Sequence, residues 1–184
     1  VPYPQVGWTQ AFLDQYLSDF LASKNNELTL DDLFDVARGV SVEMKKAGLM
    51  FSRAEVPAQD ITDGVVQLYI RPGVLGEVAV LNAKRTQSKV LARPFLDLLQ
   101  KPALRSTLDQ ALKRLEFLPG IDVFGFFSVT ERPGVSRLNI KVLREKTWTG
   151  AFGLDSYGND ATGKSRFFIN GQLLNPLGYG DRMI

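Results

Sequence analysis

The sequence contains neither cysteine nor histidine. Without cysteine there is no disulfide framework, no thiolate metal ligand and no thiol nucleophile. Without histidine the chain lacks the commonest general base and the commonest ligand of zinc and copper. No other group of residues forms a recognisable catalytic set. We therefore expect a protein that is not an enzyme and that has no catalytic, cofactor-binding or metal-binding residues.

A large net charge and a long apolar run are also missing. The 22 basic and 20 acidic residues leave a formal net charge of +2, and the two signs are interspersed along the chain. Nucleic acid binding depends on concentrated positive charge, so a nucleic-acid partner is not expected. No apolar run approaches the roughly 20 residues of a membrane-spanning helix. The 184 residues, 45% of them apolar, suffice for one or two small cores.

The segment 48–73 organises the first half of the chain. Two apolar runs, residues 49–56 and 65–70, flank a stretch that holds Pro57, Asp60, Asp63 and Gly64, and such residues reverse the direction of a chain. This pattern predicts a β-hairpin. A weak first strand is expected within residues 1–7, where two prolines and a glycine disfavour it.

Two helices are expected before the hairpin. Apolar residues recur at helical spacing from Thr9 to a stop at 24–26, and Thr29 with Asp32 is typical of a second helix start. Asp31, Asp32 and Asp35 are interpreted as helix-start carboxylates and not as a metal site. The expected apolar face of the second helix comprises Leu30, Leu33, Phe34, Ala37, Val40, Met44 and Ala47.

The same β-α-α-β-β order is expected a second time. A strand at 75–81 precedes a helix near 90–99, in which Pro94 marks either the first turn or a kink, and a helix capped by Ser106. Two strands at 121–130 and 135–143 follow. The last strands of the two units superimpose at an offset of 70 residues, which places Gly64 on Gly134 and Ile70 on Ile140. An α+β fold with an internal repeat is predicted.

The residues from Thr147 onward follow a different pattern. Strict alternation predicts a long hairpin with one strongly apolar face, and strands of about ten residues with this alternation are typical of transmembrane β-barrels. That face comprises Trp148, Gly150, Phe152, Leu154, Phe167, Ile169, Gly171 and Leu173.

Residues 158–165 match the phosphate-binding pattern G-x-x-x-x-G-K-S. A P-loop needs a helix directly after it, so that N–H groups and the helix dipole converge on the phosphate. A strand pattern follows Ser165, so we interpret the match as a hairpin turn. A P-loop nucleotide-binding enzyme remains a remote alternative, for which Lys164→Ala would abolish nucleotide binding.

Several short motifs resemble the outer-membrane transporters of bacterial two-partner secretion. They are Arg53, Val56-Pro57-Ala58-Gln59, Asp63-Gly64, Leu118-Pro119-Gly120, the run 154–159 with Thr162-Gly163, and the run 175–181. The resemblance implies two POTRA-like modules, 1–73 and 74–146, each a three-stranded mixed sheet with two helices on one face. It implies that 147–184 are the first two strands of a truncated outer-membrane β-barrel, with the modules in the periplasm.

Such a chain is expected to capture a secreted exoprotein, through that protein's N-terminal secretion domain, and to deliver it to the barrel. An extended peptide can add to the unpaired edge of a sheet, and the edges expected in POTRA-like modules are 49–56 and 121–130. Gly125 would let another backbone approach closely. A POTRA-type chaperone or scaffold of outer-membrane protein assembly is the alternative function. The predicted partner-binding residues are Phe51, Arg53, Glu55, Ile121, Val123, Phe124, Gly125, Phe126, Phe127 and Val129.

Overall fold

The computed structural model describes residues 3–61, 64–156, 158, 163 and 165–184 and has a mixed α+β fold. Its strands form one two-stranded and two three-stranded sheets. The chain divides into two compact units. Unit 1 comprises Val1–Glu77, Asp97–Asp109 and Phe127–Arg137; unit 2 comprises Val78–Leu96, Gln110–Phe126 and Leu138–Ile184.

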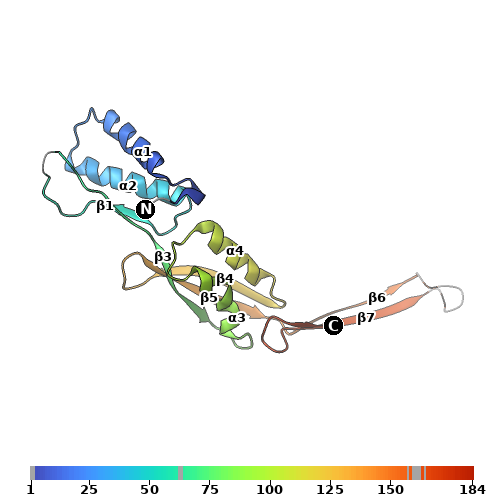
Figure 1. The fold of residues 1–184 in the computed structure, drawn as a ribbon. Helices are drawn as coiled ribbons and strands as arrows, with labels where there is room; N and C mark the ends of the chain where they lie inside the picture. Colours follow the sequence, from blue (N-terminus) through green and yellow to red (C-terminus); the bar gives the residue numbers. More distant parts are fainter. Residues whose placement is uncertain (1–2, 62–63, 157, 159–162, 164) are drawn as a thin grey trace. The chain divides into compact units, whose positions relative to one another are not determined.

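Two helices that lie side by side begin unit 1 (Figure 1): α1, Gln10–Ser23, and α2, Leu30–Lys46. They begin directly after Thr9 and Thr29, where the sequence predicts helix starts. The hydroxyl of Thr9 accepts from the N–H of Phe12 at 3.2 Å, and Thr29 and Asp32 form a reciprocal capping box. Lys24 pairs with Asp32 at 2.6 Å, and this contact and the bonds from Thr29 hold the pKa of Asp32 well below its usual value. Asp32 therefore caps the helix, as expected.

Replacing Thr29 by alanine is expected to lower the free energy of unfolding of unit 1 by about 1 kcal/mol, because the N–H of Asp32 loses its acceptor. Chemical denaturation followed by circular dichroism measures the loss. Thr29→Ser keeps the acceptor and should stay within about 0.5 kcal/mol of the wild type. Equal destabilisation by the two variants would contradict the capping role.

The buried face of α2 is rotated from the expected one. Leu33, Ala37, Val40 and Met44 are buried as expected, but Leu30 and Phe34 are 65% and 53% exposed. Val36 is buried instead. The prediction for Leu30 and Phe34 was wrong because it assigned every apolar residue at helical spacing to the buried face. The core contacts a narrower set of positions on α2.

The first expected strand is also wrong. Residues Pro4–Val6 form a 3₁₀ turn, η1, and Tyr3 and Trp8 pair across it as an isolated bridge. Proline fixes φ and has no N–H to donate, so this segment cannot extend a ladder. Tyr3 and Trp8 instead enter the core with Met44. Among the described residues, the sheet expected for residues 1–73 thus has two strands and not three.

The hairpin 48–73 is confirmed with shorter strands. Strand β1, Arg53–Glu55, pairs antiparallel with β2, Tyr69–Arg71. Between them a side-chain amide replaces ladder bonds: Gln59 Nε2 donates to the carbonyl of Gln67 at 2.9 Å, and the N–H of Gln67 donates to Gln59 Oε1 at 2.7 Å. The predicted turn residue Asp63 lies outside the described residues.

Residues 49–52 were expected in a strand, but they form hydrogen bonds and close contacts with residues outside the hairpin or at its end. The N–H of Met50 donates to the carbonyl of Ala103 at 3.1 Å, and the N–H of Ala103 donates to the carbonyl of Gly73 at 2.8 Å. The N–H of Gly73 donates to the buried Ser52 hydroxyl at 2.9 Å. A Cβ at Gly73 would lie 2.2 Å from the backbone carbon of Phe51. The segment after α2 therefore pairs with residues far along the chain.

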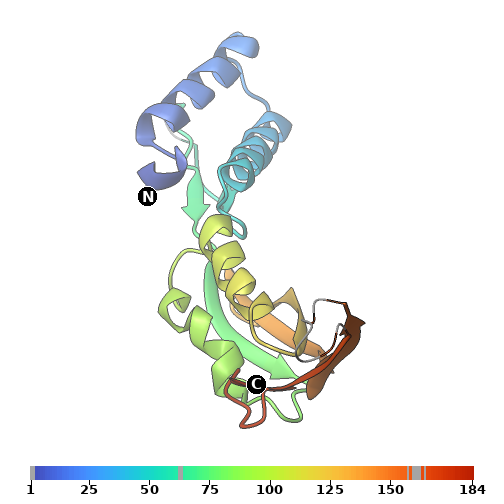
Figure 2. The same ribbon diagram turned by 90° about the vertical axis from the view of Figure 1, so that its right-hand side faces the viewer.

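The second sheet contains β3, Val74–Leu81, β4, Ile121–Val129, and β5, Val135–Glu145, in the order β3-β5-β4. Strand β4 therefore lies at an edge, as expected. The helices are α3, Ser88–Ala92, and α4, Arg105–Glu116. In unit 2, α3 and the second half of α4 lie on the same face of the sheet (Figure 2).

Pro94 lies near the start of a 3₁₀ turn, η2, Arg93–Leu98, that continues α3. It thus marks a change of helix type, which agrees with the expected irregularity. The expected cap at Ser106 is wrong, because α4 begins one residue earlier at Arg105. Thr107 Oγ1 donates to the carbonyl of Leu104 at 2.9 Å in this first turn.

The tail of unit 2 forms the predicted hairpin. Strand β6, Trp148–Asp155, pairs antiparallel with β7, Arg166–Leu174, and β8, Arg182–Met183, adds to β7 (Figure 1). The register places Phe152 opposite Ile169 and Leu154 opposite Phe167, so the predicted apolar residues share one face. That face is open, with Phe152 80% exposed.

The P-loop match falls largely on residues outside those described, namely 159–162 and 164. Strand β7 begins at Arg166, directly after Ser165. Arg166 Nε and Asp155 Oδ1 lie 2.8 Å apart across the hairpin. A strand therefore stands where a phosphate-binding helix is required, which contradicts the P-loop interpretation.

Within the described part of the chain, no helix is both long enough and apolar enough to cross a membrane. The same residues hold no group of three or more carboxylates arranged for a metal ion.

Candidate functional site

Strand β4 contains seven of the predicted partner-binding residues. Ile121 is buried, Val123, Gly125 and Phe127 are half-buried, and Phe124 and Phe126 are exposed. The exposed rings of Phe124 and Phe126 are stacked, with their centroids 6.1 Å apart. Val129, at the end of the strand, is 92% exposed. The edge strand thus presents an aromatic pair on one face and an open apolar end.

Gly125 lies close to a helix of its own unit. A Cβ built on it would lie 2.8 Å from a Cδ atom of Leu112 on α4. The missing side chain therefore makes room for a helix of the same unit. Access for the backbone of a partner is not needed to explain glycine at this position.

The remaining predicted residues lie in unit 1. Arg53 and Glu55 belong to β1, where Glu55 Oε1 pairs with Arg53 Nε at 3.1 Å and with Arg71 Nε at 2.8 Å. Phe51 precedes the strand, and its ring centroid lies 4.9 Å from that of Phe127. The structure therefore brings together Phe51 and Phe127, one residue from each predicted edge segment.

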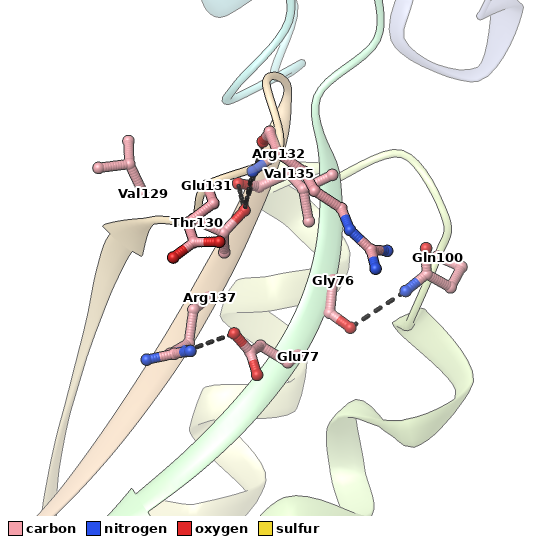
Figure 3. Close-up of a pocket in the computed structure, with 9 residues that line it drawn as sticks. All are labelled: Gly76, Glu77, Gln100, Val129, Thr130, Glu131, Arg132, Val135 and Arg137. Carbon is pink, nitrogen blue, oxygen red and sulfur yellow. Dashed lines mark hydrogen bonds and ion pairs between the residues drawn. The ribbon is translucent and has the colours of Figure 1, made fainter.

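A cavity of about 590 Å³ lies beside the β4–β5 turn (Figure 3). The polar groups that line this cavity are largely paired with one another through hydrogen bonds or ion pairs. Arg137 pairs with Glu77, Gln100 Nε2 donates to the carbonyl of Gly76 at 3.1 Å, and the N–H of Arg132 donates to the hydroxyl of Thr130 at 3.3 Å. Among the described residues no buried side-chain polar atom lacks a hydrogen-bond partner. This open, polar cavity shows no convergent set of groups for a small molecule.

Sequence reasoning missed a polar cluster in unit 2, which we call the Glu145 joint: Glu145, residues 84–86 and Asn175. The Glu145 carboxylate accepts from the N–H of Lys84 at 3.1 Å, and from both the N–H and the hydroxyl of Thr86 at 2.7 Å. It also accepts from the N–H of Arg85 at 3.1 Å. Asn175 Nδ2 donates to the Thr86 hydroxyl at 2.9 Å.

The joint continues into the loop after β7. Asn175 Oδ1 accepts from the N–H of Gly180 at 2.7 Å, and the N–H of Gln87 donates to the carbonyl of Gly178 at 3.0 Å. Burial acts to raise the pKa of Glu145, but its four N–H and O–H donors outweigh that effect and lower the pKa below its usual value. The joint therefore fixes the end of β5 and the loop of residues 175–181 to the same turn after β3.

Two family descriptions match parts of the chain. Residues 9–73 match the POTRA domain of the ShlB type, and residues 134–184 match the haemolysin secretion/activation proteins ShlB/FhaC/HecB. The first match contains both helices and the hairpin of unit 1, and the second contains β5 and the tail. The Glu145 joint includes residues from the second match, Glu145 and Asn175.

Relatives and solved structures agree with these matches. The chain is 24% identical to the heme/hemopexin transporter protein HuxB of Haemophilus influenzae over 85% of this chain and 28% of the relative. It is 26% identical to the outer membrane transporter CdiB-2 of Burkholderia pseudomallei over 98% of this chain and 30% of the relative. CdiB from Escherichia coli superimposes with a TM-score of 0.74 at 25% identity, covering 95% of this chain and 32% of that chain.

The chain spans less than a third of the length of each of these relatives. The relatives are named as transporters and not as enzymes. The two family matches follow one another along the chain, and the superposition on CdiB covers nearly all of it. Residues 9–73 therefore carry a ShlB-type POTRA domain, and the chain as a whole is similar to the outer-membrane transporters of two-partner secretion.

Proposed function

We propose that this chain is the part of a two-partner secretion transporter that captures an extended segment of the secreted protein at the β4 edge and passes it to the barrel. Residues 1–73 and 74–146 act as two tandem POTRA-like modules in the periplasm, and 147–184 begin the barrel in the outer membrane. The observation that carries the capture step is the edge position of β4 with Phe124 and Phe126 exposed on it.

The chemistry of an edge strand supports this proposal. Every second residue of an edge strand points its N–H and C=O away from the sheet, where an added strand can pair with them. Such pairing is made by backbone hydrogen bonds and therefore tolerates many sequences, while the side chains of alternate residues contribute selectivity. The exposed face of β6 and β7 suits strands that meet lipid, as expected for the start of a barrel.

A pair of proline variants, Val123→Pro and Phe124→Pro, tests strand addition. Adjacent residues point their N–H groups to opposite sides of a strand, so one proline removes a bond to β5 and the other removes only an outward N–H. The variant that keeps the wild-type unfolding midpoint is the informative one. It should lose at least about tenfold in affinity for the N-terminal secretion domain of the partner, measured by isothermal titration calorimetry.

Phe124→Ala is the matched control for side-chain contacts, because it leaves every backbone group in place. Its affinity should fall less than that of the folded proline variant. Unchanged affinity in the folded proline variant would rule out addition at β4. If unrelated unfolded barrel segments bind as tightly as the secretion domain, a general role in outer-membrane protein assembly becomes the better explanation.

A further inference from the structure

A groove of about 300 Å³ in unit 1 lies between the segment after α2 and the β4–β5 turn. Its lining includes three basic residues, Lys45, Arg53 and Arg132, and contains no carboxylate. Elsewhere the chain intersperses acidic and basic residues almost evenly. The groove therefore differs in charge from the protein as a whole.

Two of these positive charges are not compensated by the chain itself. Arg53 pairs with Glu55, but Lys45 and Arg132 make no ion pair within the part of the chain that the structure describes. Both side chains are exposed. Like charges that share a concave surface attract a negatively charged partner more strongly than isolated surface charges do.

The groove also has an apolar and well-supported floor. Its apolar lining includes Met50, Phe51 and Val129. The ring of Phe51 packs on Phe127, and the N–H of Met50 is bonded to the carbonyl of Ala103. On the other side, the hydroxyl of Thr130 donates to the carbonyl of Val135 at 2.9 Å and so closes the turn. Both walls are therefore held in place before any partner arrives.

We propose that this groove binds an acidic stretch of the same extended polypeptide that adds to β4, an inference that rests on the proposed function. Strand β4 ends at Val129, which lines the groove, so a chain paired along β4 enters the groove as it passes this residue. Apolar side chains of the added segment cover Val129 and Phe51. Its carboxylates then meet Lys45 and Arg132, which makes the preferred partner an alternating strand with acidic residues beside it, on the C-terminal side in parallel pairing and on the N-terminal side in antiparallel pairing.

Two synthetic peptides test this inference with the full chain. Both have a central alternating serine–valine stretch; glutamates flank it at both ends in one peptide and glutamines in the other, so that the test holds for either direction of pairing. The glutamate peptide should bind about tenfold more tightly at low ionic strength by fluorescence anisotropy. Lys45→Gln combined with Arg132→Gln should remove this preference, whereas Lys113→Gln combined with Arg114→Gln, an equal charge change on exposed residues of α4, should keep it.

The outcomes separate this inference from the proposed function. If both peptides bind equally and the Lys45/Arg132 variant changes nothing, the acidic preference is wrong while strand addition stands. If the folded proline variant of β4 binds like the wild type but the preference persists, strand addition fails and the groove remains an acidic-peptide site. If a glutamate run without the alternating stretch binds as tightly, or neither peptide binds, the inference is overturned.

Discussion

Gly120→Ala is expected to lower the free energy of unfolding of unit 2 by about 4 kcal/mol, the largest effect that we predict for a single methyl group. Gly120 has φ +74°, which a side chain disfavours by roughly 1–2 kcal/mol. A Cβ there would lie 2.3 Å from the carbonyl oxygen of Lys146 and 2.8 Å from Cβ of Leu174. The N–H of Lys146 donates to the carbonyl of Gly120 at 2.6 Å, so relieving the clash breaks this bond.

Gly7→Ala is a control with the same backbone conformation. Gly7 also has φ +74°, but no atom lies within 4 Å of its added Cβ. This variant should lower the free energy of unfolding only by the cost of the left-handed backbone conformation, roughly 1–2 kcal/mol. Hydrogen–deuterium exchange, followed on peptides around each glycine, measures the local loss of stability for both variants. Equal losses at the two sites would show that the close approach to Lys146 and Leu174 does not matter.

Glu145→Ala is expected to destabilise unit 2 by about 3 kcal/mol. The substitution leaves the N–H groups of residues 84–86 and the Thr86 hydroxyl without their acceptor, and a buried donor without a partner costs about 1–3 kcal/mol. Thr86 is buried, so water cannot fully replace the carboxylate. Urea denaturation followed by circular dichroism reports the change.

Glu116→Ala removes the same charge from an exposed position of α4 and should stay within about 0.5 kcal/mol of the wild type. Glu145→Gln retains one oxygen acceptor but places an amide N–H₂ among donors, so its stability should lie between those of wild type and Glu145→Ala. A Glu145→Ala protein as stable as Glu116→Ala would contradict the importance of the joint.

The same carboxylate makes the joint sensitive to acid. Its pKa is lowered in the folded state, so its contribution is complete above the ordinary glutamate value of 4.5 and is lost as the pH falls through the folded value. The difference in stability between wild type and Glu145→Ala should therefore be constant near neutral pH and shrink below about pH 4.5. A constant difference down to pH 2 would contradict this linkage.

The parts of the fold that the sequence predicts are those governed by neighbours in sequence. Thr9 and Thr29 cap helices through bonds to residues three positions away. The alternation of apolar and polar residues predicts that Phe152 and Ile169 share one face, because successive side chains of a strand point to opposite faces. The edge position of β4 came from the family resemblance and agrees with the strand order.

What the sequence did not predict depends on distant residues. Residues 49–52 look like a strand, yet the N–H of Met50 bonds to Ala103, some 50 positions later. The close approach of Leu112 to Gly125 also depends on a contact between a strand and a helix, which no local pattern signals. Nothing near Glu145 in the sequence signals a joint, because Thr86 and Asn175 lie far away on either side of it. The partner-binding residues on β4 therefore remain a prediction for the titrations to decide.

The Glu145 joint also has a consequence for the order of folding. Its Thr86–Asn175 hydrogen bond joins residues 89 positions apart, whereas β6 ends at Asp155 and β7 begins at Arg166, so their pairing closes a much shorter stretch of chain. Closing a long loop is slow, and hairpins form within microseconds, so we expect the apolar tail hairpin to form before the joint that anchors it. Until the loop of residues 175–181 docks, the tail is an unanchored apolar ribbon. Any delay at this step lengthens the time during which the newly made protein is prone to aggregate.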